Sequence, residues 1–211
     1  MQQYDPESRS LSGPVHELYK GTPAGVTEGP QLYQRNGYYY LLVAEGGTGI
    51  NHMVTFARSR SRTGPYETDP DYPVMTTAHD LTFAFQQAGH GSLVETQSGE
   101  WYMAHLCTRP IPGTGTMNPL GRETAIQHVV WTEDGWLRLA HGGKLPALAV
   151  EGPDLEPHPF PELPERDDYD TLGYPYQSLR VPFDPSLSRK QRIACQAAGL
   201  RFGVLLFFFE I

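Results

Sequence analysis

A carboxylic acid and an imidazole occupy matching places in two similar stretches of this sequence. Glu28 precedes a Gly-Pro turn and the aromatic run Tyr38–Tyr40, and His90 stands 62 residues later, between two glycines and ahead of Trp101. A protonated carboxyl can donate a proton to a leaving group, and an imidazole can hydrogen-bond a ligand or lie beside a metal. Spacing alone also fits a solvated turn carboxylate at Glu28 and a packed core histidine at His90.

The fixed offset predicts a repeat architecture. The same 62-residue step pairs Gly29 with Gly91 and Gly37 with Gly99. Units repeated at such a distance are supersecondary modules that bury their apolar faces only against their neighbours. In this register Glu28 and His90 are equivalent positions.

The elements that must position these residues are short strands. The 22 Gly, 19 Pro and 12 Tyr residues favour strands and tight turns over helices. A short outer strand is expected within residues 13–19. The other strands are expected at 30–33, 38–45, 54–59, after the turn at 63–66, and at 92–95, 101–108, 123–131 and 136–139. Four strands per roughly 60 residues is the spacing of β-propeller blades, which would place Glu28 and His90 near a shared axis.

The composition changes after residue 145. Residues 146–175 are rich in Pro, Asp and Glu and predict an extended linker. A new strand is expected at 176–181, within a C-terminal segment, 176–211, that has an atypical tail. The apolar run 203–209 predicts aggregation and is too short to span a bilayer.

Charge and cysteine content exclude several classes of partner. Sixteen Lys and Arg residues stand against 24 Asp and Glu residues, a formal net charge of −8. Nucleic acid and anionic membranes call for a basic face, so neither is expected as a partner. Cys107 and Cys195 form no metal-binding pair and are expected to be free thiols. The polar residues 1–12 carry no secretory signal, so a cytoplasmic location is expected.

Five motifs occur in order along the chain. They are Thr27-Glu28-Gly29-Pro30, Asn36-Gly37-Tyr38-Tyr39-Tyr40, Ala44-Glu45-Gly46-Gly47-Thr48-Gly49, Gly89-His90-Gly91-Ser92 and Leu120-Gly121-Arg122-Glu123-Thr124. Together they resemble glycoside hydrolase family 43, and more narrowly its β-xylosidase and α-L-arabinofuranosidase members. The resemblance runs from about residue 1 to 188.

This resemblance implies an all-β fold, a five-bladed β-propeller followed by a β-sandwich, and inverting hydrolysis of xylosides or arabinosides. It implies that Glu28 is the general acid and that Arg122, His90 and Thr48 bind the sugar. His90 would lie on the axis, where it touches a calcium ion or a water. No cofactor is required, and the expected partner is a xylo-oligosaccharide or arabinoside.

The resemblance covers only part of the family's pattern. Residues 1–145 resemble the last three blades, so a partial propeller of about three blades with the truncated start of a sandwich is expected. Inverting glycosidases need two carboxyl groups about 6.5–9.5 Å apart. The aspartate that acts as general base in the family has no counterpart in this chain. The alternative is therefore a non-catalytic fragment or carbohydrate-binding remnant.

Other interpretations stay open at individual positions. Arg122 is also typical of a surface ion pair with Glu123. The tyrosines and tryptophans alternate with strand period, which favours packing between blades over a role as sugar platforms. An open arc of blades exposes apolar faces and unpaired strand edges, so self-association is expected.

Overall fold

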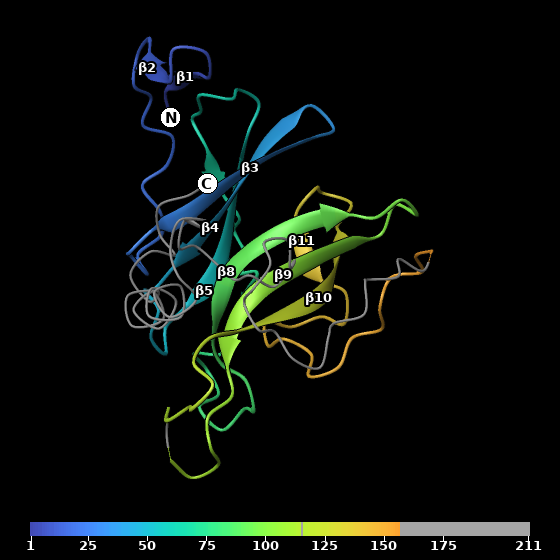
Figure 1. Cartoon of the computed structure of the whole chain (residues 1–211). Helices are drawn as coiled ribbons and strands as arrows, with labels where there is room; N and C mark the ends of the chain where they lie inside the picture. The colour runs from blue at the N-terminus through green and yellow to red at the C-terminus, as the bar shows by residue number, and fades with distance from the viewer. Residues whose placement is uncertain (115, 157–211) are drawn as a thin grey trace, which may run out of the picture. The chain divides into compact units, whose positions relative to one another are not determined.

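The described part of the chain consists of strands joined by turns. The computed structural model describes residues 1–114 and 116–156, and Figure 1 follows them along the chain. The strands are β1 (Gln3–Asp5), β2 (Ser10–Ser12), β3 (Glu28–Arg35), β4 (Tyr38–Glu45), β5 (Met53–Ser59), β6 (Glu67–Thr68), β7 (Met75–Thr76), β8 (Gln86–Glu95), β9 (Trp101–Thr108), β10 (Glu123–Trp131) and β11 (Leu137–Leu139). Within these ranges no helix is long and apolar enough to cross a membrane. The all-β prediction is confirmed.

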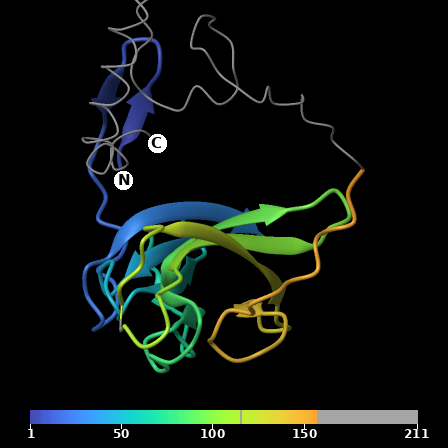
Figure 2. The ribbon, with the colours of Figure 1, turned by 60° about the horizontal axis from the view of Figure 1, so that its bottom comes forward.

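Two antiparallel meanders make up most of the structure. The first sheet has the order β3-β4-β5-β6, with β7 also paired to β5, and the second has the order β11-β10-β9-β8. β1 and β2 form a separate two-stranded ribbon, which stands apart from the larger sheets in Figure 2. The described residues thus form a five-stranded sheet, a four-stranded sheet and a ribbon, and the expected count of about three blades is not confirmed.

The two central hairpins follow the turn chemistry of their sequences. Asn36 and Gly37 have φ angles of 47° and 74°, and they form a two-residue turn between the paired residues Arg35 and Tyr38. Both central residues of such a turn need positive φ, which Asn-Gly supplies at low cost. In the second hairpin Thr96 donates its amide to the carbonyl of Glu100 at 2.8 Å, so this connection is one residue longer.

Aromatic side chains fill the space between the sheets. The ring of Tyr40 on β4 stacks on Phe56 of β5 at 5.2 Å and tilts against Trp131 of β10 at 4.8 Å. Trp131 in turn meets Trp101 edge to face at 5.4 Å. Tyr40 and Phe56 are buried, so these rings hold one blade against the next, as their strand periodicity predicts.

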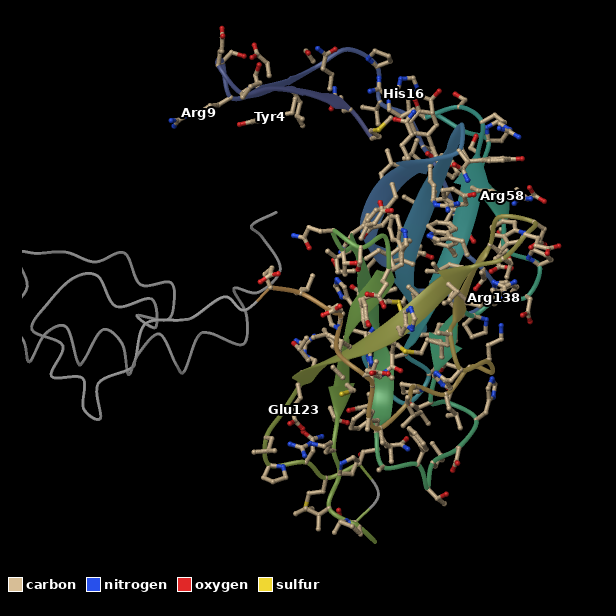
Figure 3. The ribbon with its side chains drawn as sticks, turned by 90° about the vertical axis from the view of Figure 1, so that its right-hand side faces the viewer. Tyr4, Arg9, His16, Arg58, Glu123 and Arg138 are labelled. Carbon is tan, nitrogen blue, oxygen red and sulfur yellow. The ribbon has the colours of Figure 1, made fainter. Side chains whose placement is uncertain are left out.

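A buried ion pair joins the outer part of the two sheets. The guanidinium of Arg138 on β11 binds both carboxylate oxygens of Asp69, which follows β6; the Nη2–Oδ1 distance is 2.9 Å. Asp69 has no exposed surface. Arg138 also contacts Asp71 at 3.3 Å, and Lys144 contacts the same carboxylate at 2.9 Å. Figure 3 shows Arg138 and Arg58 on the same side of the sheets.

The N-terminal expectation was wrong in one respect. No strand forms within residues 13–19; the ribbon strands β1 and β2 lie before them. Pro14 has no amide to donate to a ladder. The segment is instead held by backbone bonds between His16 and Met1, at 2.8 Å from the His16 amide to the Met1 carbonyl, and by the Tyr19 hydroxyl, which bonds the Thr68 hydroxyl at 2.9 Å.

The predicted domain boundaries stay predictions. Met1–Glu156 form one compact unit, which includes the first residues of the predicted linker, 146–175. The rest of that linker, the strand expected at 176–181 and the tail lie outside the described residues, as does Cys195. Cys107 is buried and has a free thiol, and burial raises its pKa.

Candidate active site

One end of the two sheets gathers the chemistry-bearing residues. In antiparallel meanders the start of one strand lies beside the end of the next. Glu28 at the start of β3 therefore pairs with Ala44 near the end of β4, and Glu123 at the start of β10 pairs with Cys107 near the end of β9. The site residues that the sequence predicts lie toward this end of the two sheets.

Glu28 stands at a β-bulge. The ladder between β3 and β4 shifts between Glu28 and Gln31, and Gly29 within the bulge has a φ of 57°. A bulge turns a strand locally and redirects its side chains. Glu28 is half-buried. Within the described residues its carboxylate has no hydrogen bond or ion pair.

His90 lies inside β8, where the strand carries two bulges. The ladder with β9 shifts between Gln86 and Gly89 and again between Gly89 and Ser92, and His90 has a φ of 55°. The imidazole lies directly against Gly29: a Cβ added to that glycine would be 2.6 Å from Nε2 and 2.8 Å from Cε1. The structure therefore brings His90 next to the backbone that carries Glu28.

The ladders correct the predicted equivalence of Glu28 and His90. Gln31 pairs with Leu42 and Ser92 pairs with Ala104. The offset is therefore 62 residues between β4 and β9 but 61 between β3 and β8, because the second hairpin connection is one residue longer. The bulge before Gln31 and the bulge between Gly89 and Ser92 match each other, and their left-handed residues are Gly29 and His90, so Glu28 corresponds to Gly89.

Each residue of the Gly89-His90-Gly91-Ser92 motif has a separate packing partner. A Cβ on Gly89 would be 2.5 Å from the ring of His52, and one on Gly91 would be 2.7 Å from the sulfur of Met103 on β9 and 3.2 Å from Val54 of β5. Ser92 donates its hydroxyl to Gln31 of β3 at 2.8 Å. The motif therefore packs tightly against both the first sheet and β9, which explains the two glycines.

His52 is a site residue that spacing did not reveal. It precedes β5, is 1% exposed, and its Nδ1 lies 2.9 Å from the carbonyl of Gln87, so Nδ1 carries the proton that it donates. Nε2 is buried without a partner among the described residues. Burial lowers the pKa of His52; the Gln87 bond opposes this, and the charges of His90, Glu28 and Arg122 also act on it. The charges of three predicted site residues thus act on one buried imidazole.

Arg122 comes directly before β10 and is exposed. The alternative interpretation paired it with Glu123. In the structure the carboxylate of Glu123 accepts bonds from Arg109, at 3.0 Å from Nε to Oε2 and 2.6 Å from Nη2 to Oε1. These bonds lower the pKa of Glu123. Figure 3 shows Glu123 at the loop end of β10.

Thr48 lies in the connection between β4 and β5 and is exposed. The structure shows no hydrogen bond between its side chain and another described residue. Its place in the pocket stays a prediction.

Glu45 is a second residue that the sequence did not single out. It ends β4 and is fully buried. One carboxylate oxygen, Oε1, accepts bonds from the amide of Thr22 at 2.7 Å and the hydroxyl of Thr27 at 2.8 Å. The other, Oε2, accepts a bond from the hydroxyl of Thr55 at 2.6 Å. The residues next to Glu45 in its motif, 44–49, did not indicate these bonds, because all three donors lie outside that motif.

The predicted calcium ion can be tested against this set of side chains. Calcium takes six to eight oxygen ligands. The described ranges contain no group of three or more His, Cys, Asp or Glu side chains that could hold a metal. A calcium ion that reaches His90 through a water stays a prediction.

Comparison with known proteins places the chain in a family. The model of glycosyl hydrolases family 43 matches residues 1–137. A xylan 1,3-beta-xylosidase of a Vibrio species is 45% identical over 179 residues, which are 80% of this chain and 33% of that protein. A xylosidase/arabinosidase 43B of Humicola insolens is 46% identical over 153 residues, 72% of this chain and 28% of that protein.

A solved structure gives the same result. The crystal structure of a xylan beta-1,4-xylosidase from Bacillus halodurans C-125 matches with a TM-score of 0.78 and 56% identity, covering 87% of this chain and 35% of that chain. The chain thus spans about a third of the length of the relatives that it matches. With the family model covering residues 1–137, this chain belongs to glycosyl hydrolase family 43.

Proposed function

We propose that this chain is the part of a β-xylosidase or α-L-arabinofuranosidase that carries the general acid, Glu28. The proposed reaction is inverting hydrolysis of xylan-derived glycosides. The observation that carries the proposal is the placement of Glu28: it lies at a bulge, beside the ring of His90, at the sheet end where Arg122 also lies. Members of this family with names of both activities share the matched region.

In the proposed reaction the protonated carboxyl of Glu28 gives its proton to the glycosidic oxygen. The bond between that oxygen and the anomeric carbon breaks, and its electron pair stays on the departing oxygen. A water molecule attacks the anomeric carbon from the opposite face while a second carboxylate removes its proton. We assign that second carboxylate to residues outside these 211, since only one carboxylate, Glu28, lies among the predicted site residues.

Arg122, His90 and Thr48 have binding roles in this proposal. The guanidinium of Arg122 offers several donors to sugar hydroxyls. His90 packs on Gly29 and so shapes the floor of the site next to the acid. Thr48, exposed in the β4–β5 connection, adds a hydroxyl from the rim.

The experiment that tests the function compares wild-type chain with Glu28→Gln on p-nitrophenyl xyloside and p-nitrophenyl arabinofuranoside. General acid assistance is worth about 10²–10⁴-fold, so turnover should fall by that range in the variant. Glu100→Gln is the matched control, because Glu100 lies at the far turn before β9. Turnover that is equal in Glu28→Gln and wild type, or absent from both, would overturn the enzymatic function of this chain.

A second candidate function is binding of a pentose without hydrolysis. It is favoured by the length of the match, because the chain spans about a third of its relatives. Calorimetry with xylo-oligosaccharides on the wild-type chain and on Arg122→Gln separates the two. Binding that weakens in the Arg122 variant, together with no turnover, supports this second function.

We also propose that the chain associates with a second copy of itself. Val94, Ile126 and Val130 share the outer face of the second sheet and are 55%, 44% and 40% exposed. The first sheet already covers the opposite face of these strands. In the proposed dimer a second copy covers the outer face in the same way. Light scattering should show a dimer that Ile126→Lys converts to a monomer; a wild-type monomer would contradict the proposal.

A further inference from the structure

Glu45 is a buried carboxylate that the proposed reaction does not use. A carboxylate without solvent contact is costly unless each of its oxygens finds donors. Here three donors come from two segments: the amide of Thr22 and the hydroxyl of Thr27 from the connection before β3, and the hydroxyl of Thr55 from β5. The buried carboxylate therefore ties the connection before β3 to the ends of β4 and β5.

The donors place Glu45 next to the proposed acid. Thr27 is the residue before Glu28, and Glu28 pairs in the ladder with Ala44, the residue before Glu45. Gly21 covers the contact so closely that a Cβ there would collide with both the Thr27 hydroxyl and the Glu45 carboxylate. The hydrogen bond from Thr27 to Glu45 is therefore enclosed by protein on this side.

Glu28 is thus held from both flanks. On one side Thr27 is bonded to Glu45 at 2.8 Å, and on the other side Gly29 lies against the ring of His90. The carboxylate of Glu28 itself has no hydrogen bond in the described residues. Its position is set through the backbone of its two neighbours.

We propose that Glu45 is a positioning residue for the general acid and that it acts through Thr27. This inference rests on the proposed function of Glu28. A proton donor must lie within hydrogen-bond reach of the leaving oxygen, and a misplacement of about 1 Å can lower the rate about 10²-fold. Glu45 does not touch substrate, because it has no exposed surface and its oxygens are occupied by the three donors.

Two matched variants separate positioning from stability. Thr27→Val and Thr55→Val each remove one hydroxyl donor to the same carboxylate, but only Thr27 adjoins Glu28. The readout is kcat with two xylosides: methyl xyloside, whose leaving alkoxide needs a proton, and 2,4-dinitrophenyl xyloside, whose leaving group departs without one. Thr27→Val should lower kcat about tenfold or more on the first and less than about twofold on the second.

The control variants have defined expectations. Thr55→Val should change kcat by a similar factor on both substrates. Glu45→Gln keeps an oxygen for Thr22 and Thr27 and should retain the wild-type dependence on leaving group. An equal effect of Thr27→Val on both substrates, or the same dependence on leaving group in Thr55→Val, would overturn the inference.

A measurement without turnover keeps the inference separate from the proposed function. NMR relaxation of the 211-residue chain reports the order of the Glu28 amide, with an order parameter of about 0.85 for a rigid backbone and below about 0.6 for a flexible one. It should fall toward the flexible value in Thr27→Val and Glu45→Ala and stay unchanged in Thr55→Val. If wild type has no turnover, the enzymatic function of this 211-residue chain fails, and an unchanged Glu28 amide in both variants would independently refute the role of Glu45.

Discussion

The imidazole of His90 lies against the α-carbon of Gly29, with no room for a side chain between the two sheets at this point. A Cβ on Gly29 would be 2.6 Å from His90 Nε2, and the backbone there has a φ of 57°. Glycine is required twice over, by the left-handed backbone and by the approach of the ring. The contact ties the residue after Glu28 to the second sheet.

Gly29→Ala should therefore destabilise the chain and move His90. The left-handed backbone costs an alanine about 1–2 kcal/mol, and the collision with the ring adds to it. Gly99→Ala is the control, because Gly99 has a φ of 83° and open space around it. Urea unfolding should show a larger loss for Gly29→Ala, and only that variant should shift the NMR signals of His90. Equal losses with unmoved His90 signals would contradict this.

Two buried histidines predict that stability falls below about pH 6.5. Burial is the main cause that lowers the pKa of both His52 and His105. In this window the unfolded chain binds protons that the native chain does not, so the free energy of unfolding decreases as the pH falls, by up to about 1.4 kcal/mol per pH unit for each histidine. Above the pKa that these histidines have in the unfolded chain, their contribution to the free energy of unfolding is fully present.

Urea unfolding between pH 7 and about pH 5 measures this slope before most carboxylates titrate. His52→Gln and His105→Gln should each lower the slope of the unfolding free energy against pH by the amount that corresponds to the uptake of up to one proton. A wild-type slope near zero in this range would refute the expectation.

Arg138→Met should cost about 3–5 kcal/mol of unfolding free energy. The variant leaves Asp69, which has no exposed surface, without its charged partner. Lys144→Met removes a contact to the exposed Asp71 and should cost less than about 1 kcal/mol. The midpoint and slope of urea unfolding give both values. A similar small loss in the two variants would show that the buried pair contributes little.

Tyr33→Phe should weaken the contact between the sheets near the C-terminal end of β3. The hydroxyl of Tyr33 accepts the amide of Leu93 at 2.8 Å and donates to Gln31. Without it the partly buried amide loses its partner, at a cost of about 1–3 kcal/mol. Hydrogen exchange at Leu93 should speed up more than at the other amides of β8. Unchanged exchange there would show that the amide finds another acceptor.

The sequence alone predicted the strands and turns whose signals come from residues close together in the chain. Asn36-Gly37 predicted its hairpin, and the predicted ranges 38–45, 101–108 and 123–131 match β4, β9 and β10. Alternation and turn residues are local signals, so they survive without knowledge of the fold. The family motifs likewise placed Glu28 and His90 in the first strands of their sheets.

The start of β8 shows why the pattern was insufficient elsewhere. The sequence predicted a strand from residue 92, but β8 begins at Gln86, because two bulges break the alternation that reveals a strand. The longer second hairpin connection shifts β3 and β8 by one residue relative to β4 and β9. A sequence offset cannot detect this shift, since it depends on which residues pair.

By itself, the sequence determined the strand order, the turns and the identity of the acid candidate. Only the tertiary structure decided that His52 is buried against Gln87, that Glu45 accepts a bond from Thr27, that Gly29 lies against His90, and that Glu123 pairs with Arg109. Burial and hydrogen bonds between distant segments produce these relationships. They arise from packing of the two sheets, which no local spacing encodes.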